Sequence, residues 1–183
     1  MKKIISLSLI MLFSLLIVTP QSQASIYALK SKYPVFPNLY SYSNAKAMKS
    51  ASFKYYGLKL RQNYPAMIKQ WGKPSSSTVT RSFGYTAGSY FYGLDNSVLV
   101  STMAKGEKAS SSRFIIDSFT ISKINHSKYE LSKVNKYFGK PTSTTTSGNY
   151  KVNDYGNYVN ITFTKVGSKW YVDTLNLHRY SFQ

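Results

Sequence analysis

The chain contains no cysteine, and it has few acidic residues and few histidines. Its 183 residues include two His and six Asp or Glu. The lack of cysteine excludes disulfides, thiolate metal sites, a cysteine nucleophile and a thiol-linked lipid anchor. Because no cross-link can support the fold, the protein must rely on its own hydrophobic core. Its length suits one domain or two very small ones.

The shortage of acids and histidines leaves little material for catalysis. A carboxylate pair for glycoside hydrolysis would have to be assembled from scattered positions, and His126 and His178 are interpreted as ordinary surface or edge residues. We therefore expect a protein that is not an enzyme and that uses no metal and no cofactor. A small hydrolase dependent on Asp117 or Asp173 is the minor alternative.

Long hydrophobic runs are missing except at the start of the chain. Lys2 and Lys3 precede an apolar run over 4–18, which is followed by the small-residue site Ser22-Gln23-Ala24. This order is typical of a secretory signal peptide, and the run is shorter than the roughly 20 residues that span a bilayer. The sequence predicts a signal peptide over 1–24 and a secreted mature chain with no transmembrane segment, either free or retained at the cell surface by charge.

The charge balance is strongly basic. With 24 Lys and Arg against six acids the net charge is +18, and without Lys2 and Lys3 it is +16 (22 minus 6). Such an excess attracts anions. The expected partners are extracellular DNA or RNA, an anionic wall polymer, an acidic lipid surface or an acidic protein. Most basic residues are lysines, which favour phosphate contacts over reading of base edges, so we expect little sequence preference.

An internal repeat organises the rest of the sequence. The segment 71–74 (Trp-Gly-Lys-Pro) recurs at 138–141 (Phe-Gly-Lys-Pro), 67 positions later. Before each copy, apolar residues recur at i, i+3 and i+7, which is one face of a helix. These residues are Tyr64, Met67 and Trp71 in the first copy, and Leu131, Val134 and Phe138 in the second.

The boundaries of both helices can also be predicted. Gly72 and Gly139 suit a helix C-terminus, and the following prolines cannot continue the helix. Asn63 can cap the first helix, and Ser127 with Glu130 suggests a capping box for the second.

A second repeated motif lies at 114–121 and 170–177, where Asp117 and Asp173 occupy the same place in a strand-like pattern. Further strand-like runs lie between the helix and this motif in each copy, at 78–85, 89–94, 98–103, 142–146, 150–152 and 158–164. The sequence therefore predicts an α+β fold of two tandem units, each a short helix plus a roughly four-stranded antiparallel sheet, sharing one core. The expected divisions are an N-terminal arm over 25–52, unit 1 over 53–122 and unit 2 over 123–183.

These features resemble a known architecture and a known family. Tandem helix-plus-four-strand units whose helices end in Gly-Lys-Pro resemble the β-lactamase-inhibitor-type architecture. The basic charge, the tyrosine content and the run 53–60 (Phe-Lys-Tyr-Tyr-Gly-Leu-Lys-Leu) are similar to the immunodominant staphylococcal antigen B family. That family consists of secreted proteins associated with extracellular nucleic-acid binding, so the resemblance implies such a role and no catalytic residues. An architecture alone does not decide function.

The repeat also selects candidate binding residues, because it aligns basic positions of the two copies. Lysines near a helix C-terminus are favoured by the helix dipole whatever the function, but two basic helix ends could also form one anion-binding face. The predicted polyanion-binding residues are Lys54, Lys59, Arg61, Lys69, Lys73, Lys128, Lys136 and Lys140.

Tyrosines supply the second group of candidates. The chain has 17 of them, and exposed rings hold single-stranded nucleic acid by stacking, although tyrosines also cover half-buried sheet faces. The predicted stacking residues are Tyr55, Tyr90, Tyr92, Tyr155 and Tyr158, and all but Tyr55 are expected to be exposed. Asp117 and Asp173 are expected to share a structural role rather than a catalytic one.

The sequence thus favours a secreted, non-enzymatic binding protein for extracellular polyanions, with nucleic acid as the leading partner. The alternative is a secreted inhibitor or adhesin that binds another protein through a concave sheet. Such binding would depend on aromatic anchors and would survive raised salt.

Overall fold

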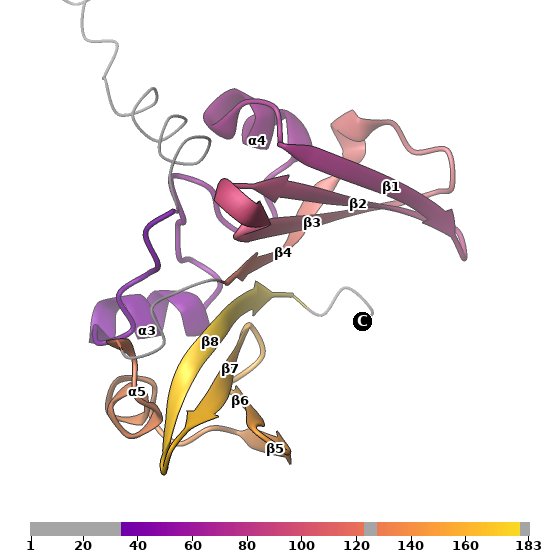
Figure 1. The fold of residues 1–183 in the computed structure, drawn as a ribbon. Coiled ribbons are helices and arrows are strands. Elements are labelled where there is room, and N and C mark those ends of the chain that lie inside the picture. Colours follow the sequence, from indigo (N-terminus) through magenta and orange to yellow (C-terminus); the bar gives the residue numbers. More distant parts are fainter. Residues whose placement is uncertain (1–33, 123–127, 180–183) are drawn as a thin grey trace, which may run out of the picture.

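The computed structural model describes residues 34–122 and 128–179, and it shows an α+β fold (Figure 1). Its helices are α3 (Tyr42–Lys49), α4 (Tyr64–Trp71) and α5 (Leu131–Phe138). Four strands follow α4, namely β1 (Ser76–Ser82), β2 (Tyr85–Tyr92), β3 (Val98–Lys105) and β4 (Ile115–Ile121). Four more follow α5, namely β5 (Ser143–Ser147), β6 (Tyr150–Asp154), β7 (Val159–Val166) and β8 (Lys169–His178).

All eight strands belong to one antiparallel sheet, in the order β1-β2-β3-β4-β8-β7-β6-β5. The prediction of a roughly four-stranded sheet in each unit is therefore wrong in size. The two sets of strands join where β4 pairs with β8 from Ser118↔His178 to Ile121↔Leu175. Separate sheets would leave both strands with a free edge of unpaired backbone groups, and their pairing removes these edges.

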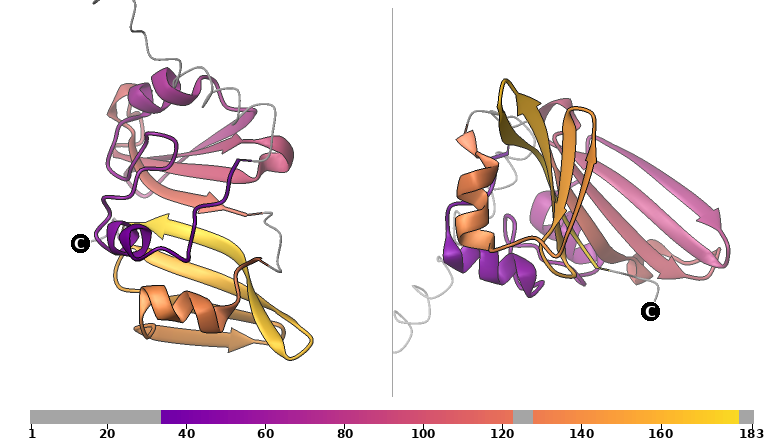
Figure 2. Two further views of the ribbon diagram at one scale, coloured as in Figure 1. Left: turned by 90° about the vertical axis from the view of Figure 1, so that its left-hand side faces the viewer. Right: turned by 90° about the horizontal axis from the view of Figure 1, so that it is seen from below.

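The three helices cover one face of the sheet, as Figure 2 shows from the side of the helices. Burial alternates along β2 and β3, so every second side chain faces the helices. On the helices, the predicted apolar positions Met67, Trp71, Val134 and Phe138 are all buried. The buried hydrophobic residues of both halves form one core cluster.

The predicted helix ends are largely confirmed. The Asn63 side chain accepts a hydrogen bond from Ala66 N at 2.9 Å, and Gly72 and Gly139 follow their helices with φ of 72° and 82°. The capping box at α5 is wrong, because Glu130 is the N-cap itself and its side chain makes no cap bond. Ser127, its expected partner, lies outside the described residues.

The first hairpin turns earlier than the sequence predicts. Its turn is Phe83-Gly84, and Gly88 lies inside β2 rather than between strands. A Cβ added at Gly88 would come within 2.5 Å of the Tyr90 hydroxyl oxygen. This glycine therefore makes room for a tyrosine ring and does not mark a turn.

The segment over 25–52, expected as an arm, contributes several residues to the core within the part that the structure describes, 34–52. It contains α3, and Leu39, Ala45 and Met48 are buried. Lys49 Nζ donates a hydrogen bond to Phe138 O at 2.9 Å, which ties α3 to the C-terminal end of α5. The first nine residues of this segment and the predicted signal peptide lie outside the described ranges.

Candidate polyanion-binding trough

The basic residues are concentrated in the helix-bearing layer. Segments 34–75 and 128–141, which contain the three helices, hold eleven Lys and Arg but only one acid, Glu130. By contrast, neutral hydroxyl side chains follow one another across the uncovered face of the sheet, from Thr78 through Ser89 and Ser101 to Ser118. The molecule therefore has a cationic face and a largely neutral polar face, and anions are attracted to the first.

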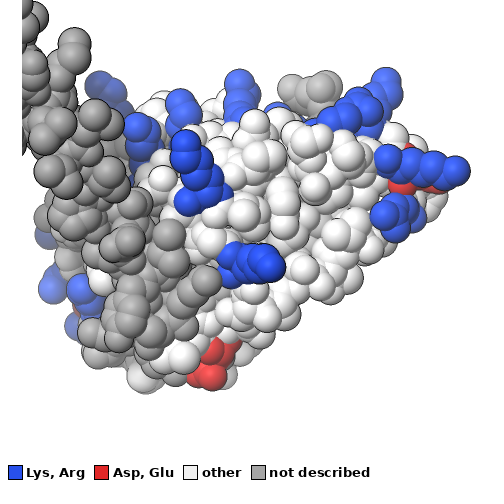
Figure 3. All heavy atoms as spheres, turned by 90° about the horizontal axis from the view of Figure 1, so that it is seen from above, with Lys and Arg blue, Asp and Glu red and all other residues white. Residues whose placement is uncertain are grey.

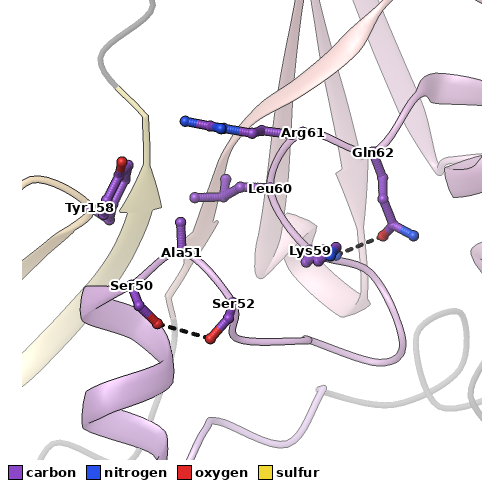
Figure 4. A pocket seen from close by; sticks show the side chains of 8 residues that line it. All are labelled: Ser50, Ala51, Ser52, Lys59, Leu60, Arg61, Gln62 and Tyr158. Atoms are coloured by element: carbon purple, nitrogen blue, oxygen red, sulfur yellow. Dashed lines mark hydrogen bonds between the residues drawn. The ribbon is translucent and has the colours of Figure 1, made fainter.

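A polar cleft of about 480 Å³ opens in the cationic face. Its walls come from the end of α3, from the loop before α4 and from the turn before β7. The loop is fixed on β4, because Arg61 N donates to Ile116 O at 2.9 Å and Ile116 N donates to Gln62 O at 2.7 Å. The cleft is lined by Ser50, Ala51, Ser52, Lys59, Leu60, Arg61, Gln62 and Tyr158. Figure 4 shows Arg61 and Leu60 extending across it toward Tyr158.

Two cations and two hydroxyls characterise this cleft. Lys59 and Arg61 are exposed, and neither forms an ion pair with any residue that the structure describes. The Ser50 and Ser52 hydroxyl oxygens lie 2.9 Å apart, and both are within hydrogen-bond distance of Ala47 O. The single hydrogen of each hydroxyl is engaged in these bonds, so Lys59 and Arg61 are the groups that suit an oxyanion. A guanidinium can bind two oxygens of an oxyanion at once.

A second hollow of about 390 Å³ adjoins the first at Ser50. It is lined by Tyr42, Lys46, Lys49, Ser50 and Tyr137. Tyr42 is 68% exposed, and its ring centroid lies 4.9 Å from that of Tyr137. Tyr42 and Ser50 are about 12 Å apart along α3, at 1.5 Å per residue. We call the two hollows together the trough: one end offers aromatic rings with lysines, and the other offers Lys59 and Arg61.

The structure brings together only part of the predicted basic set. All eight residues are exposed, but only Lys59 and Arg61 line the trough. Figures 1 and 2 place α4 and α5 over different halves of the sheet. The ends of these helices therefore do not merge into the single anion-binding face that the sequence suggested. Lys128 Nζ lies 5.4 Å above the ring of Tyr129.

The predicted stacking residues are mostly in the core. Tyr55, Tyr90, Tyr92 and Tyr155 are 4, 3, 1 and 1% exposed, so the expected exposure of the last three is wrong. The ring of Tyr92 packs on Trp71 and its hydroxyl donates to Gly72 O at 3.0 Å. Burial raises the pKa of Tyr155 to about 12. Tyr158 is partly exposed and lines the trough.

Sequence reasoning missed the aromatic end of the trough. Tyr42, Lys46 and Lys49 are spaced at i, i+4 and i+7, which places them on one face of a helix. This signal could have been used only after α3 had been predicted. Tyr137 could have been considered from the sequence, since it lies in a predicted helix, and the structure places it partly buried at the edge of the core.

The two repeated aspartates occupy β-bulges. Ser101 pairs with Ser118 and Thr102 with Ile116, so the register skips Asp117. In the same way, the β7–β8 register passes from Thr174 to Val172 and skips Asp173. Arg179 binds Asp117 twice, from Nε to Oδ1 and from N to the backbone oxygen, each at 3.0 Å. This geometry favours the expected structural role, because the extra residue of a bulge bends and twists the strand.

The remaining candidates for chemistry add little. His126 lies outside the described residues, and partial burial holds the pKa of His178 below 6.5 although Asp154 and Asp117 oppose this shift. Within residues 34–122 and 128–179, no cluster of three or more His, Asp and Glu could hold a metal ion. No helix in these ranges is long and apolar enough to cross a membrane.

The chain matches no family model, no curated protein and no solved structure. The functional assignment therefore relies on the trough and on the charge of the layer around it.

Proposed function

We propose that this protein is a non-enzymatic binding protein for extracellular polyanions, with nucleic acid as its main partner, and that the trough is its binding site. The observation that carries the proposal is that Lys59 and Arg61 line one polar cleft, beside a hollow that holds two tyrosines. Both cations lack ion-pair partners within the described part of the chain, so an incoming phosphate does not have to displace a carboxylate.

The aromatic end of the trough favours nucleic acid over polyanions without rings. A base can stack on the exposed ring of Tyr42, while the backbone phosphates contact Lys46 and Arg61. The side-chain oxygen of Gln62 already accepts a hydrogen bond from Lys59 N at 2.8 Å, which reduces its use for reading a base edge. We therefore expect single strands to bind with little sequence preference.

We further propose that residues 1–24 are removed on export and that the mature protein is secreted, either free or retained at the cell surface by charge. The resemblance to the immunodominant staphylococcal antigen B family belongs to the same proposal and remains a prediction.

The two halves are proposed to be copies of one unit. Asn63, just before α4, forms a β-bridge with Ile115 of β4. In the same way Glu130, just before α5, forms a β-bridge with Tyr171 of β8. These pairs occupy matching positions of the two sequence motifs, as do the bulge residues Asp117 and Asp173. Duplication of one helix-plus-four-strand unit, followed by joining of the two fourth strands, accounts for these correspondences.

Direct binding measurements test the functional proposal. Residues 25–183 would be titrated against a labelled single-stranded DNA and, by competition, against inorganic polyphosphate, which has no rings. The paired change Lys59→Glu and Arg61→Glu should weaken binding to both. Tyr42→Ala should weaken binding to DNA by about five- to tenfold, the low end of one base-stacking contact, and leave the polyphosphate competition unchanged.

A control must separate the trough from general charge. Lys165→Glu changes the net charge of the protein by the same amount as Arg61→Glu. Lys165 lies at the far end of β7, roughly 20 Å along the strand from Tyr158. Its change should reduce affinity much less than Arg61→Glu. Equal losses in the two variants would place the binding outside the trough. No DNA binding at about 50 mM salt would reject the function and direct attention to a protein partner.

A further inference from the structure

The tip of the first β-hairpin is strained and apolar. Ser82 pairs with Tyr85, and the two residues between them, Phe83 and Gly84, have φ of 51° and 76°. Two positive φ angles define the type I′ turn, whose first position normally holds Asn, Asp or Gly. An aromatic residue is costly in this conformation. Phe83 is nevertheless there, and it is 96% exposed, so neither the turn nor the core explains its presence.

Phe83 forms part of the wall of an apolar hollow on the uncovered face of the sheet. This hollow of about 220 Å³ is lined by Thr80, Ser82, Phe83, Tyr85, Ala87 and Met103. Phe83, Ala87 and Met103 give it a largely hydrophobic wall at the outer end of the hairpin. An apolar surface at a protruding tip is favourable only when something removes it from water.

Cations surround this tip. Arg81 pairs with Thr86, whereas Lys105 pairs with Tyr85, so the two basic side chains project from opposite faces of the hairpin. Lys108 follows in a loop fixed on the tip, because Gly84 N donates to Glu107 Oε1 at 3.1 Å and Gly106 N donates to Gly84 O at 2.6 Å. Three cations thus accompany one carboxylate. Figure 3 shows basic side chains gathered at this end of the molecule beside an acidic group.

We propose that the β1–β2 hairpin tip is a membrane-binding element that inserts Phe83 into the interfacial layer of an anionic lipid bilayer. The apolar ring enters the boundary between headgroups and acyl chains, while Arg81, Lys105 and Lys108 stay at the level of the lipid phosphates. A cleft in another protein could accept the ring, but it would not account for cations on both faces of the hairpin. The tip lies at the opposite end of the molecule from α3 (Figure 1), so this site is separate from the trough.

Vesicle binding of residues 25–183 tests the proposal. The vesicles would contain phosphatidylglycerol and phosphatidylcholine in equal parts, with pure phosphatidylcholine as the neutral comparison. Phe83→Asn places a preferred residue in the turn, so the variant should fold at least as stably as the unmodified protein. It should nevertheless reduce the partition coefficient by about ten- to a hundredfold, the range expected for losing a buried phenylalanine.

Two further variants make the test specific. Val79→Ser removes another exposed apolar side chain of β1, 41% exposed and away from the turn, and should leave partitioning unchanged. When anionic vesicles are added, the tryptophan fluorescence of Phe83→Trp should gain a blue-shifted component. The unmodified protein, which has only Trp71 and Trp170, should not show this component. The proposal is overturned if Phe83→Asn partitions like the unmodified protein, if the new tryptophan stays in water, or if no vesicle binds. Changes at Lys59 and Arg61 report on the trough, so the two sites can fail independently.

Discussion

The salt dependence of DNA binding should reveal how many cations of the trough contact phosphate. Three can turn toward a bound strand, namely Lys46, Lys59 and Arg61, whereas Lys49 Nζ is held against Phe138 O at the end of α5 and is not counted. Each phosphate contact to a single strand contributes about 0.7 to the slope of log K against log salt, so the expected slope is about −2.1. Between about 50 and 200 mM salt, affinity should then fall by about twentyfold.

Replacing one cation should change this slope by a fixed amount. Arg61→Gln removes one phosphate contact, so the slope should become about −1.4 and the loss over the same range about sevenfold. Fluorescence anisotropy of a labelled oligonucleotide at several salt concentrations measures both values, with Lys165→Gln as the control that should keep the original slope. An unchanged slope in Arg61→Gln, or an equal change in the control, would refute the assignment of phosphate contacts to the trough.

Three further predictions concern stability. Trp71→Ala should lower the free energy of unfolding by about 3–5 kcal/mol in urea denaturation, because this fully buried ring leaves a cavity; a loss below about 1 kcal/mol would contradict its place in the core. Gly88→Ala should cost about 1–3 kcal/mol by overpacking against the Tyr90 ring, and a stabilised variant would be inconsistent with this contact. The folded state holds the pKa of His178 below its usual 6.5, so the unfolded chain binds more protons as the pH falls past that value, and stability should decrease. His178→Asn should show less of this loss between about pH 7.5 and 5.5, and identical pH profiles would argue against the shift.

Local signals predicted the parts of the fold that depend on neighbours in sequence. The i, i+3, i+7 spacing of Tyr64, Met67 and Trp71 identified the buried face of α4, and Asn63 and Gly72 identified its ends. The size of the sheet could not be predicted in this way. It depends on the pairing of Ser118 with His178, two residues 60 positions apart, and no local pattern specifies which strand a free edge will meet.

The candidate site was predicted only in part, for a similar reason. Lys59 and Arg61 were identified by charge, but the tyrosines were selected as though composition decided exposure. Tyr92 packs on Trp71 of α4 and Tyr155 on Phe138 of α5, so both rings are covered by helices. Tyr42 was missed because α3 has no acidic first turn and little apolar periodicity, and packing on α5 stabilises this short helix instead.

The join between β4 and β8 also sets an order of events for a newly made chain. Synthesis completes the first four strands long before β8 exists, so the edge of β4 stays unpaired until β8 has been made. During that interval the nascent first half exposes backbone groups that can pair with another chain. Truncation before residue 175 would make this interval permanent, since the pairing partners Leu175 to His178 would be missing. Pairing of β8 with β4 is therefore the step that completes the eight-stranded sheet.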